Sequence, residues 1–187
     1  MSITSVKSGD TGISLALENN YMEPIATYSI GAAGSGTIIF SGIPQVYKHL
    51  QLRVHQRITQ IATDDQTYVR FNGDAGNNYS YHYLAGQGSS GIVGGTFSSN
   101  NILGFRSSGA SSGANIFGVG VMDILDYSSN TKNKTTKTLT GSDQNGSGSI
   151  FFWSGMWQNT NPITSIYIIP NAGIAQYSRY SLYGIKG

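Results

Sequence analysis

The last third of the chain constrains the fold most, because it has the pattern of aromatic-rich β-strands that continue to the C-terminus. Residues 150–157 read IFFWSGMW, residues 163–169 read ITSIYII, and a third such segment covers residues 175–185. The turn-forming pairs Asn161-Pro162 and Pro170-Asn171 separate them. Short apolar runs bounded by Asn, Pro and Gly are typical of antiparallel strands. The segment therefore predicts an all-β protein.

The composition of the whole chain fits the same structure. Of its 187 residues only 11% are charged, whereas 25 are glycine and 11% are aromatic. About a quarter of residues are charged in an ordinary globular domain. The aromatic content argues against disorder, and the length predicts one domain. The absence of cysteine excludes disulfides and thiol chemistry.

Upstream segments show the alternation of half-buried strands. Residues 48–58 are the longest example, with Leu50, Leu52 and Val54 on one face. We expect residues 115–127 to be buried on both faces, and the polar residues 132–139 to form an edge strand, where charge discourages unwanted pairing. Three further expectations concern glycine-rich segments. Residues 31–36 should join residues 25–30 and 37–40 as a hairpin, and residues 86–101 and 106–114 should be long loops.

This pattern gives nine or ten short strands and no helical periodicity. It predicts an antiparallel β-sandwich of jelly-roll type over residues 24–187, preceded by an N-terminal arm of residues 1–23. A lipocalin-like barrel is disfavoured, because the expected long loops connect up-and-down strands poorly. We expect no cleaved signal peptide and no membrane span, since no apolar run is long enough.

The arm carries aliphatic side chains that it cannot bury by itself. They are Ile3, Ile13, Leu15 and Leu17, and the last three alternate as in a strand. Such a strand can pair with the free sheet edge of a neighbouring subunit. We therefore expect the arm to form an interface; the alternative is that it folds back on its own sandwich.

The titratable residues do not form a recognisable catalytic or metal site. Asp123 and Asp126 are three residues apart, which places them on opposite faces of a strand, unlike the paired carboxyls of a glycosidase. His49 and His55 lie about 20 Å apart along one strand, too far to share a metal. Residues 72–78 alternate Asn and Asp but lack the final acid of a calcium loop, so we interpret them as a turn. We predict no cofactor and no metal.

Two further groups could contact partners. Tyr79, Tyr81 and Tyr83 alternate on one face, where they could form core, a subunit or virion interface, or a surface for glycans. The basic cluster of Lys132, Lys134 and Lys137 is short, and the net charge is only +2. We therefore expect no nucleic-acid partner.

Several segments, in order along the chain, resemble a family of bacteriophage virion structural proteins. The segments are residues 43–53 (IPQVYKHLQLR), 70–74 (RFNGD), 78–81 (NYSY), 154–157 (SGMW) and 176–185 (QYSRYSLYGI). The resemblance implies a β-sandwich displayed on a phage particle, made in the host cytoplasm and carrying no catalytic motif. Residues 1–23 lie outside it.

The resemblance leads to a functional expectation. We expect a non-enzymatic decoration (cement) protein that stabilises the capsid by contacting the major capsid protein. By analogy with virion jelly rolls, it should form a homo-oligomer, most simply a trimer. The alternative is a tail or fibre component that contacts a host glycan through loops such as residues 85–95. A carbohydrate-cleaving enzyme ranks third, for want of a carboxylate pair.

Overall fold

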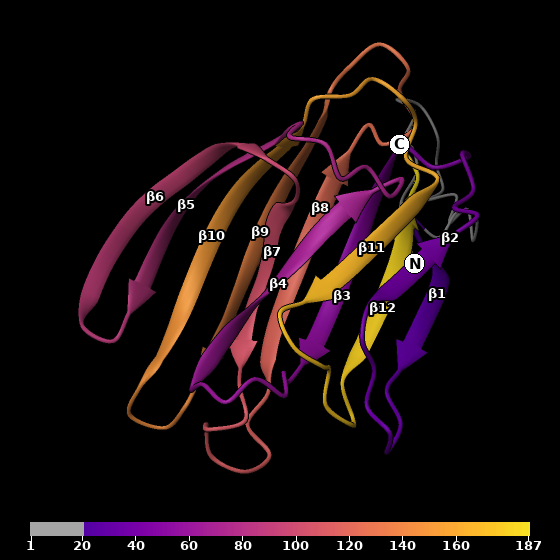
Figure 1. Ribbon diagram of the computed structural model, residues 1–187. Coiled ribbons are helices and arrows are strands. Elements are labelled where there is room, and N and C mark those ends of the chain that lie inside the picture. Colours follow the sequence, from indigo (N-terminus) through magenta and orange to yellow (C-terminus); the bar gives the residue numbers. More distant parts are fainter. Residues whose placement is uncertain (1–20) are drawn as a thin grey trace, which may run out of the picture.

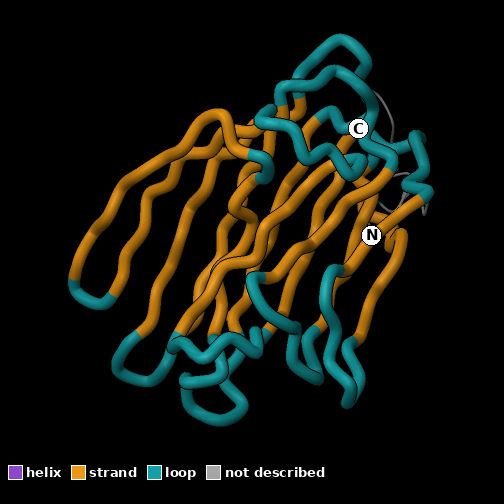
Figure 2. The backbone as a smooth tube through the Cα atoms, in the orientation of Figure 1, coloured by secondary structure: helices purple, strands orange, loops and turns teal. Residues whose placement is uncertain are grey.

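The computed structural model describes residues 21–187, and Ile3, Ile13, Leu15 and Leu17 of the expected arm lie outside these residues. The described part consists of strands and loops and contains no helix (Figure 2). The twelve strands are β1 (Met22–Ser29), β2 (Ile38–Ser41), β3 (His49–Gln56), β4 (Asp64–Phe71), β5 (Tyr79–Gln87), β6 (Ser90–Ser99), β7 (Ile102–Ser108), β8 (Gly118–Leu125), β9 (Lys134–Asp143), β10 (Gly148–Trp157), β11 (Ser165–Pro170) and β12 (Arg179–Ile185). None of residues 21–187 belongs to a helix that is long and apolar enough to span a membrane.

The strands form two sheets of unequal size. The large sheet has eight strands in the order β1-β12-β3-β8-β9-β10-β5-β6, and the small sheet has four in the order β2-β11-β4-β7. All neighbouring strands are antiparallel. The small sheet lies in front of the large one in Figure 1, and β5 and β6 extend beyond its edge. The predicted antiparallel β-sandwich is confirmed, and the jelly-roll type stays a prediction.

Alternating apolar residues from both sheets form the core. Leu50, Leu52 and Val54 of β3 are buried, as their spacing predicts, and Phe71 of β4 and Ile168 of β11 belong to the same cluster. Successive side chains of a strand point to opposite faces, so strands such as β3, β4 and β8 bury every second residue between the sheets. The core thus lies where the small sheet covers the large one.

The hairpin expected between residues 25–30 and 37–40 is wrong. β1 pairs with β12 in the large sheet, whereas β2 pairs with β11 in the small sheet. The glycine-rich segment between them therefore crosses from one sheet to the other. A turn between two apolar runs indicates a change of direction, and it does not show which sheet each run joins.

The loop expected over residues 86–101 is also wrong, because it contains β6. β5 and β6 form a hairpin in which Gln87 pairs with Ser90. Gly94 lies opposite Tyr83, and a Cβ atom at Gly94 would be 2.6 Å from the Tyr83 hydroxyl oxygen. The tyrosine ring thus covers the glycine, which compensates for the packing that a glycine in a strand lacks.

The polar strand expected at a sheet edge lies in the middle of the large sheet. β9 pairs with β8 on one side and β10 on the other. Its inward residues Thr136, Thr138 and Thr140 are buried beneath β7, and the Thr140 hydroxyl donates to the Arg106 carbonyl at 3.0 Å. The edge prediction fails because small hydroxyl side chains pack here against the other sheet.

The neighbouring strand β8 is buried on one face only, which corrects the expectation for residues 115–127. Met122 and Ile124 are fully buried, whereas Val119 and Val121 are 58% and 38% exposed. The small sheet covers just one side of β8, and residues 21–187 place nothing on the other.

Candidate functional site

A row of exposed apolar side chains crosses the outer face of the large sheet. Its members come from five neighbouring strands of the sheet, β8, β9, β10, β5 and β6. They pair directly: Val121 with Leu139, Leu139 with Phe152, Phe152 with Leu84, and Leu84 with Val93. All five side chains are exposed: Val121 by 38%, Leu139 by 53%, Phe152 by 45%, Leu84 by 59% and Val93 by 75%. We call these five residues the apolar row.

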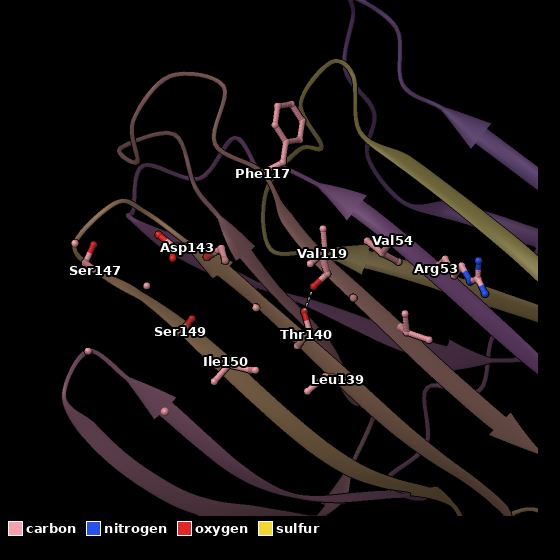
Figure 3. A pocket seen from close by; sticks show the side chains of 18 residues that line it. Arg53, Val54, Phe117, Val119, Leu139, Thr140, Asp143, Ser147, Ser149 and Ile150 are labelled. Atoms are coloured by element: carbon pink, nitrogen blue, oxygen red, sulfur yellow. Dashed lines mark hydrogen bonds between the residues drawn. The ribbon is translucent and has the colours of Figure 1, made fainter.

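Next to the apolar row, the same face is hollowed. The hollow has a volume of about 920 Å³, and Val119, Gly141, Ile150 and Gly86 cross its floor as paired residues. The two glycines carry no side chains, so space remains between Val119 and Ile150. Figure 3 shows both side chains, with Phe117 and Arg53 farther out in the lining.

Polar residues border the apolar row on its other side. Asp123 accepts a hydrogen bond from the Gln51 amide at 2.9 Å and lies 3.4 Å from the Lys137 ammonium. Asp126 follows β8 in a turn and pairs with Lys132 at 2.7 Å. The hydrogen bond from Lys132 lowers the pKa of Asp126. Both carboxylates thus have cationic partners and do not face each other as a pair.

A second concave surface lies on the inner face of the large sheet, where β5, β6 and β10 extend past the edge strand β7 (Figure 1). We call it the corner groove. It has a volume of about 320 Å³. Its principal lining residues are Tyr81 and Tyr83 of β5, Phe151 and Trp153 of β10, Ile92, Gly94 and Thr96 of β6, Leu103 and Arg106 of β7, and Gln66 of β4.

Aromatic rings in mutual contact form the floor of the corner groove. The Trp153 ring centre is 4.7 Å from that of Tyr83 and 5.2 Å from that of Phe151. Phe151 and Trp153 are almost fully buried, while Tyr81 and Tyr83 are half-buried. Burial raises the pKa of the Tyr81 hydroxyl. The tyrosines therefore present the accessible part of the aromatic floor.

The three tyrosines predicted to share a face have different environments. Tyr79 belongs to the main core, is 1% exposed, and donates a hydrogen bond from its hydroxyl to the Asp74 carbonyl at 3.0 Å. Burial raises its pKa to about 12. Tyr81 and Tyr83 lie farther along β5, where the small sheet no longer covers the large one. Their interface role stays a prediction, and Tyr79 serves the core.

A close ion pair stands on the wall of the corner groove. The Arg106 guanidinium donates two hydrogen bonds to the Asp64 carboxylate, at 2.6 and 3.0 Å. Its carbon atom also lies 5.1 Å from the centre of the Phe151 ring. Parallel hydrogen bonds from Arg to a carboxylate fix the planar group firmly. The pair makes this wall rigid and leaves little net charge on it.

The segment that resembled a calcium loop is a turn built by side-chain hydrogen bonds. Asp74 accepts from the Gly76 backbone, the Asn78 amide and the Trp157 indole, each at 2.8 Å. Asn72 accepts from the Thr164 backbone at 2.8 Å. Protein donors engage both oxygens of Asp74, so the turn interpretation is confirmed.

Residues 21–187 contain no group of three or more His, Cys, Asp or Glu side chains that could hold a metal ion. His49 accepts a hydrogen bond from the Asp126 backbone, and His55 stacks on Phe117 with ring centres 4.8 Å apart. These contacts fit structural roles for both histidines.

Comparisons with models of protein families, with curated proteins and with solved structures find no match. Function is therefore inferred from the two surfaces, the apolar row and the corner groove. Sequence reasoning identified Tyr81 and Tyr83, and it missed the apolar row and Arg106. The apolar row could be found only from the structure, which shows the order of the strands and which residues of each strand point outward.

Proposed function

We propose that this protein is a non-enzymatic structural protein of a bacteriophage particle, a decoration protein that binds the capsid shell through the apolar row. The observation that carries the proposal is the unbroken line of exposed apolar side chains over five strands. The resemblance of residues 43–185 to phage virion proteins supplies the kind of partner, which is the major capsid protein.

The size of the apolar row favours a protein partner. Neighbouring strands are about 4.8 Å apart, so five strands span about 19 Å. Contiguous exposed apolar patches of this kind mark interaction surfaces. A small ligand would occupy only part of this length, whereas the surface of another protein can cover all of it.

The energy of the contact suits repeated copies. Covering the exposed half of five aliphatic or aromatic side chains contributes roughly 4–8 kcal/mol before the costs of association. After the costs of association are subtracted, the free energy of binding of a single copy is small. Linked copies on a regular shell gain affinity from multivalency. A protein that binds the assembled shell but not its free subunits also stabilises the shell by mass action.

One edge of the large sheet, unpaired among residues 21–187, supports self-association. β6 is ten residues long, forms one edge, and contains no charged residue and no proline. Val93 and Phe97 on this strand are 75% and 84% exposed. Long uncharged edges readily pair with another chain. We propose that β6 of one copy pairs with the other edge strand, β1, of the next copy, because such a head-to-tail contact can close into the expected trimer. Residues 1–23 would form a further contact.

The test is the amount of this protein in purified phage particles relative to the major capsid protein. A decoration protein is present in numbers comparable with the shell subunit, whereas a tail component is present in far fewer copies. Leu139→Glu and Phe152→Glu place charge in the apolar row and should abolish decoration of undecorated shells. Ile61→Glu is the matched control, because Ile61 is 86% exposed in a loop outside the row.

Two results would overturn the proposal. The first is a copy number far below that of the shell subunit. The second is normal decoration by both apolar-row variants, provided that their circular dichroism and thermal unfolding match those of the native protein.

A further inference from the structure

We propose that the corner groove binds a neutral saccharide, one or two sugar rings of a polysaccharide chain. This goes beyond the proposed decoration function, because the groove lies on the inner face of β5, β6 and β10, opposite the apolar row. A protein fixed to a shell by its outer face would keep the groove available.

The floor of the groove offers what the apolar face of a sugar ring requires. The half-buried ring of Tyr81 packs edge-on against Trp153, and that of Tyr83 packs at a tilt, with the Tyr83 and Trp153 ring centres 4.7 Å apart. Aromatic side chains combine a flat apolar surface with a polar group at the edge. The C–H groups of a sugar can pack on the rings while its hydroxyls reach the polar edge.

Polar groups around the floor have unused hydrogen-bonding capacity. Gln66 and Tyr83 line the groove, and their side chains form no hydrogen bond within residues 21–187. The amide can both donate and accept, and the hydroxyl can do the same. Sugar hydroxyls present both kinds of partner at once.

Beneath the floor, the indole N–H of Trp153 is a buried donor without an acceptor in the described part of the chain. Buried polar groups in proteins are nearly always paired, and each exception calls for an explanation. This N–H is shielded from solvent, so the contribution of Trp153 to the groove is its ring, which supports Tyr83.

The charge of the groove favours a neutral ligand. Arg106 is the cation in the lining, and its guanidinium is engaged by both oxygens of Asp64. An acidic sugar would compete with Asp64 for Arg106 and would be repelled by that carboxylate. The volume of about 320 Å³ lies at the small end of the range of about 300–1,000 Å³ for ligand pockets, which suits one or two rings.

The experiment uses the full-length protein on an array of bacterial surface polysaccharides, followed by titration with neutral and uronic-acid oligosaccharides in saturation-transfer NMR. We expect binding to neutral members. Removing one hydrogen-bonding group, by Tyr83→Phe or Gln66→Leu, should weaken binding about three- to ten-fold. Tyr177→Phe is the matched control, because Tyr177 is 72% exposed outside the groove.

Gly94 offers a second kind of variant, one that changes the shape of the groove without removing a polar group. A Cβ atom at this position would be 2.6 Å from the Tyr83 hydroxyl oxygen, so Gly94→Ala should displace the end of the tyrosine while leaving every polar group present. We expect weaker saccharide binding with little loss of stability. Trp153→Phe, which leaves a smaller ring to support Tyr83, should also weaken binding.

Three outcomes would overturn the inference: no array member binds, acidic sugars bind in preference to neutral ones, or Tyr83→Phe and Gln66→Leu bind as the native protein does. The tyrosine variant keeps its ring, so loss of folding does not confuse the result. Failure here is distinct from failure of the proposed function, since Leu139→Glu should abolish decoration and leave saccharide binding intact.

Discussion

The ring of Tyr47 lies directly against the backbone of Gly184. A Cβ atom at Gly184 would be 2.3 Å from two carbon atoms of that ring. The Tyr47 hydroxyl donates to Glu23 at 3.0 Å, and Lys186 pairs with the same carboxylate. Hydrogen bonds from Lys186 and Tyr47 lower the pKa of Glu23. The contact thus holds together β1, the segment before β3 and the end of β12.

Gly184→Ala should destabilise the protein by about 1–3 kcal/mol, because the added methyl group must displace the Tyr47 ring. The measurement is urea unfolding followed by circular dichroism, with an unchanged slope and a lower midpoint. Gly36→Ala is the control, since a Cβ there meets nothing within 4 Å and should change stability by less than about 0.5 kcal/mol. Equal stability of the two variants would contradict the prediction.

The hydrogen bond between Trp157 and Asp74 gives a second prediction. Asp74→Asn leaves fewer acceptor sites for the Trp157 indole, the Asn78 amide and the Gly76 backbone. We expect a loss of about 1–2 kcal/mol at neutral pH, because a buried donor then lacks a full partner. Chemical unfolding monitored by tryptophan fluorescence measures it. Asp143→Asn is the control, since Asp143 bonds to a nearby backbone N–H in an exposed turn.

The same carboxylate predicts a pH dependence. Burial opposes ionisation of Asp74, but the hydrogen bonds from Asn78, Trp157 and Gly76 outweigh it and hold its pKa below the ordinary 3.8. A lowered carboxyl pKa contributes stability that is complete above the unfolded value and is lost as pH falls through the folded value. The difference between native protein and Asp74→Asn should therefore shrink below pH 3.8. A constant difference would contradict this.

Lys134 supports a third prediction, because its ammonium group is buried and holds three backbone carbonyls. Nζ donates to Ser129 at 2.7 Å, to Lys132 at 2.8 Å and to Thr160 at 2.9 Å. Burial lowers its pKa. Lys134→Met keeps the apolar stem and removes these bonds, which should cost about 2–3 kcal/mol. Thermal unfolding measures it.

Lys132→Met is the matched control for this change. Its side chain is 65% exposed and pairs with Asp126 at the surface, where an ion pair contributes at most about 1 kcal/mol. If both lysine variants unfold at the same temperature, the three carbonyl contacts of Lys134 do not stabilise the fold.

The sequence by itself determined the local structure. Period-two alternation identified β3 with its buried Leu50 and Leu52, and the aromatic pattern identified β10. The Asn and Asp side chains of residues 72–78 predicted a turn, since such side chains bond to nearby backbone groups. The shared face of Tyr81 and Tyr83 followed from the same alternation. In each of these cases the cause lies within a few residues of the effect.

The tertiary structure decided which strands are neighbours and which faces are covered. Alternation shows that Val119 and Val121 share one face and Met122 and Ile124 the other, but both pairs are apolar, so the sequence cannot tell core from surface. The answer depends on which face of β8 the small sheet covers. Four strands cannot cover eight, and nothing in residues 21–187 lies on the outer face. The inequality opens the corner groove on the inner face, whereas the apolar row is exposed because the small sheet packs on the opposite face. Burial is thus set by contacts between distant segments.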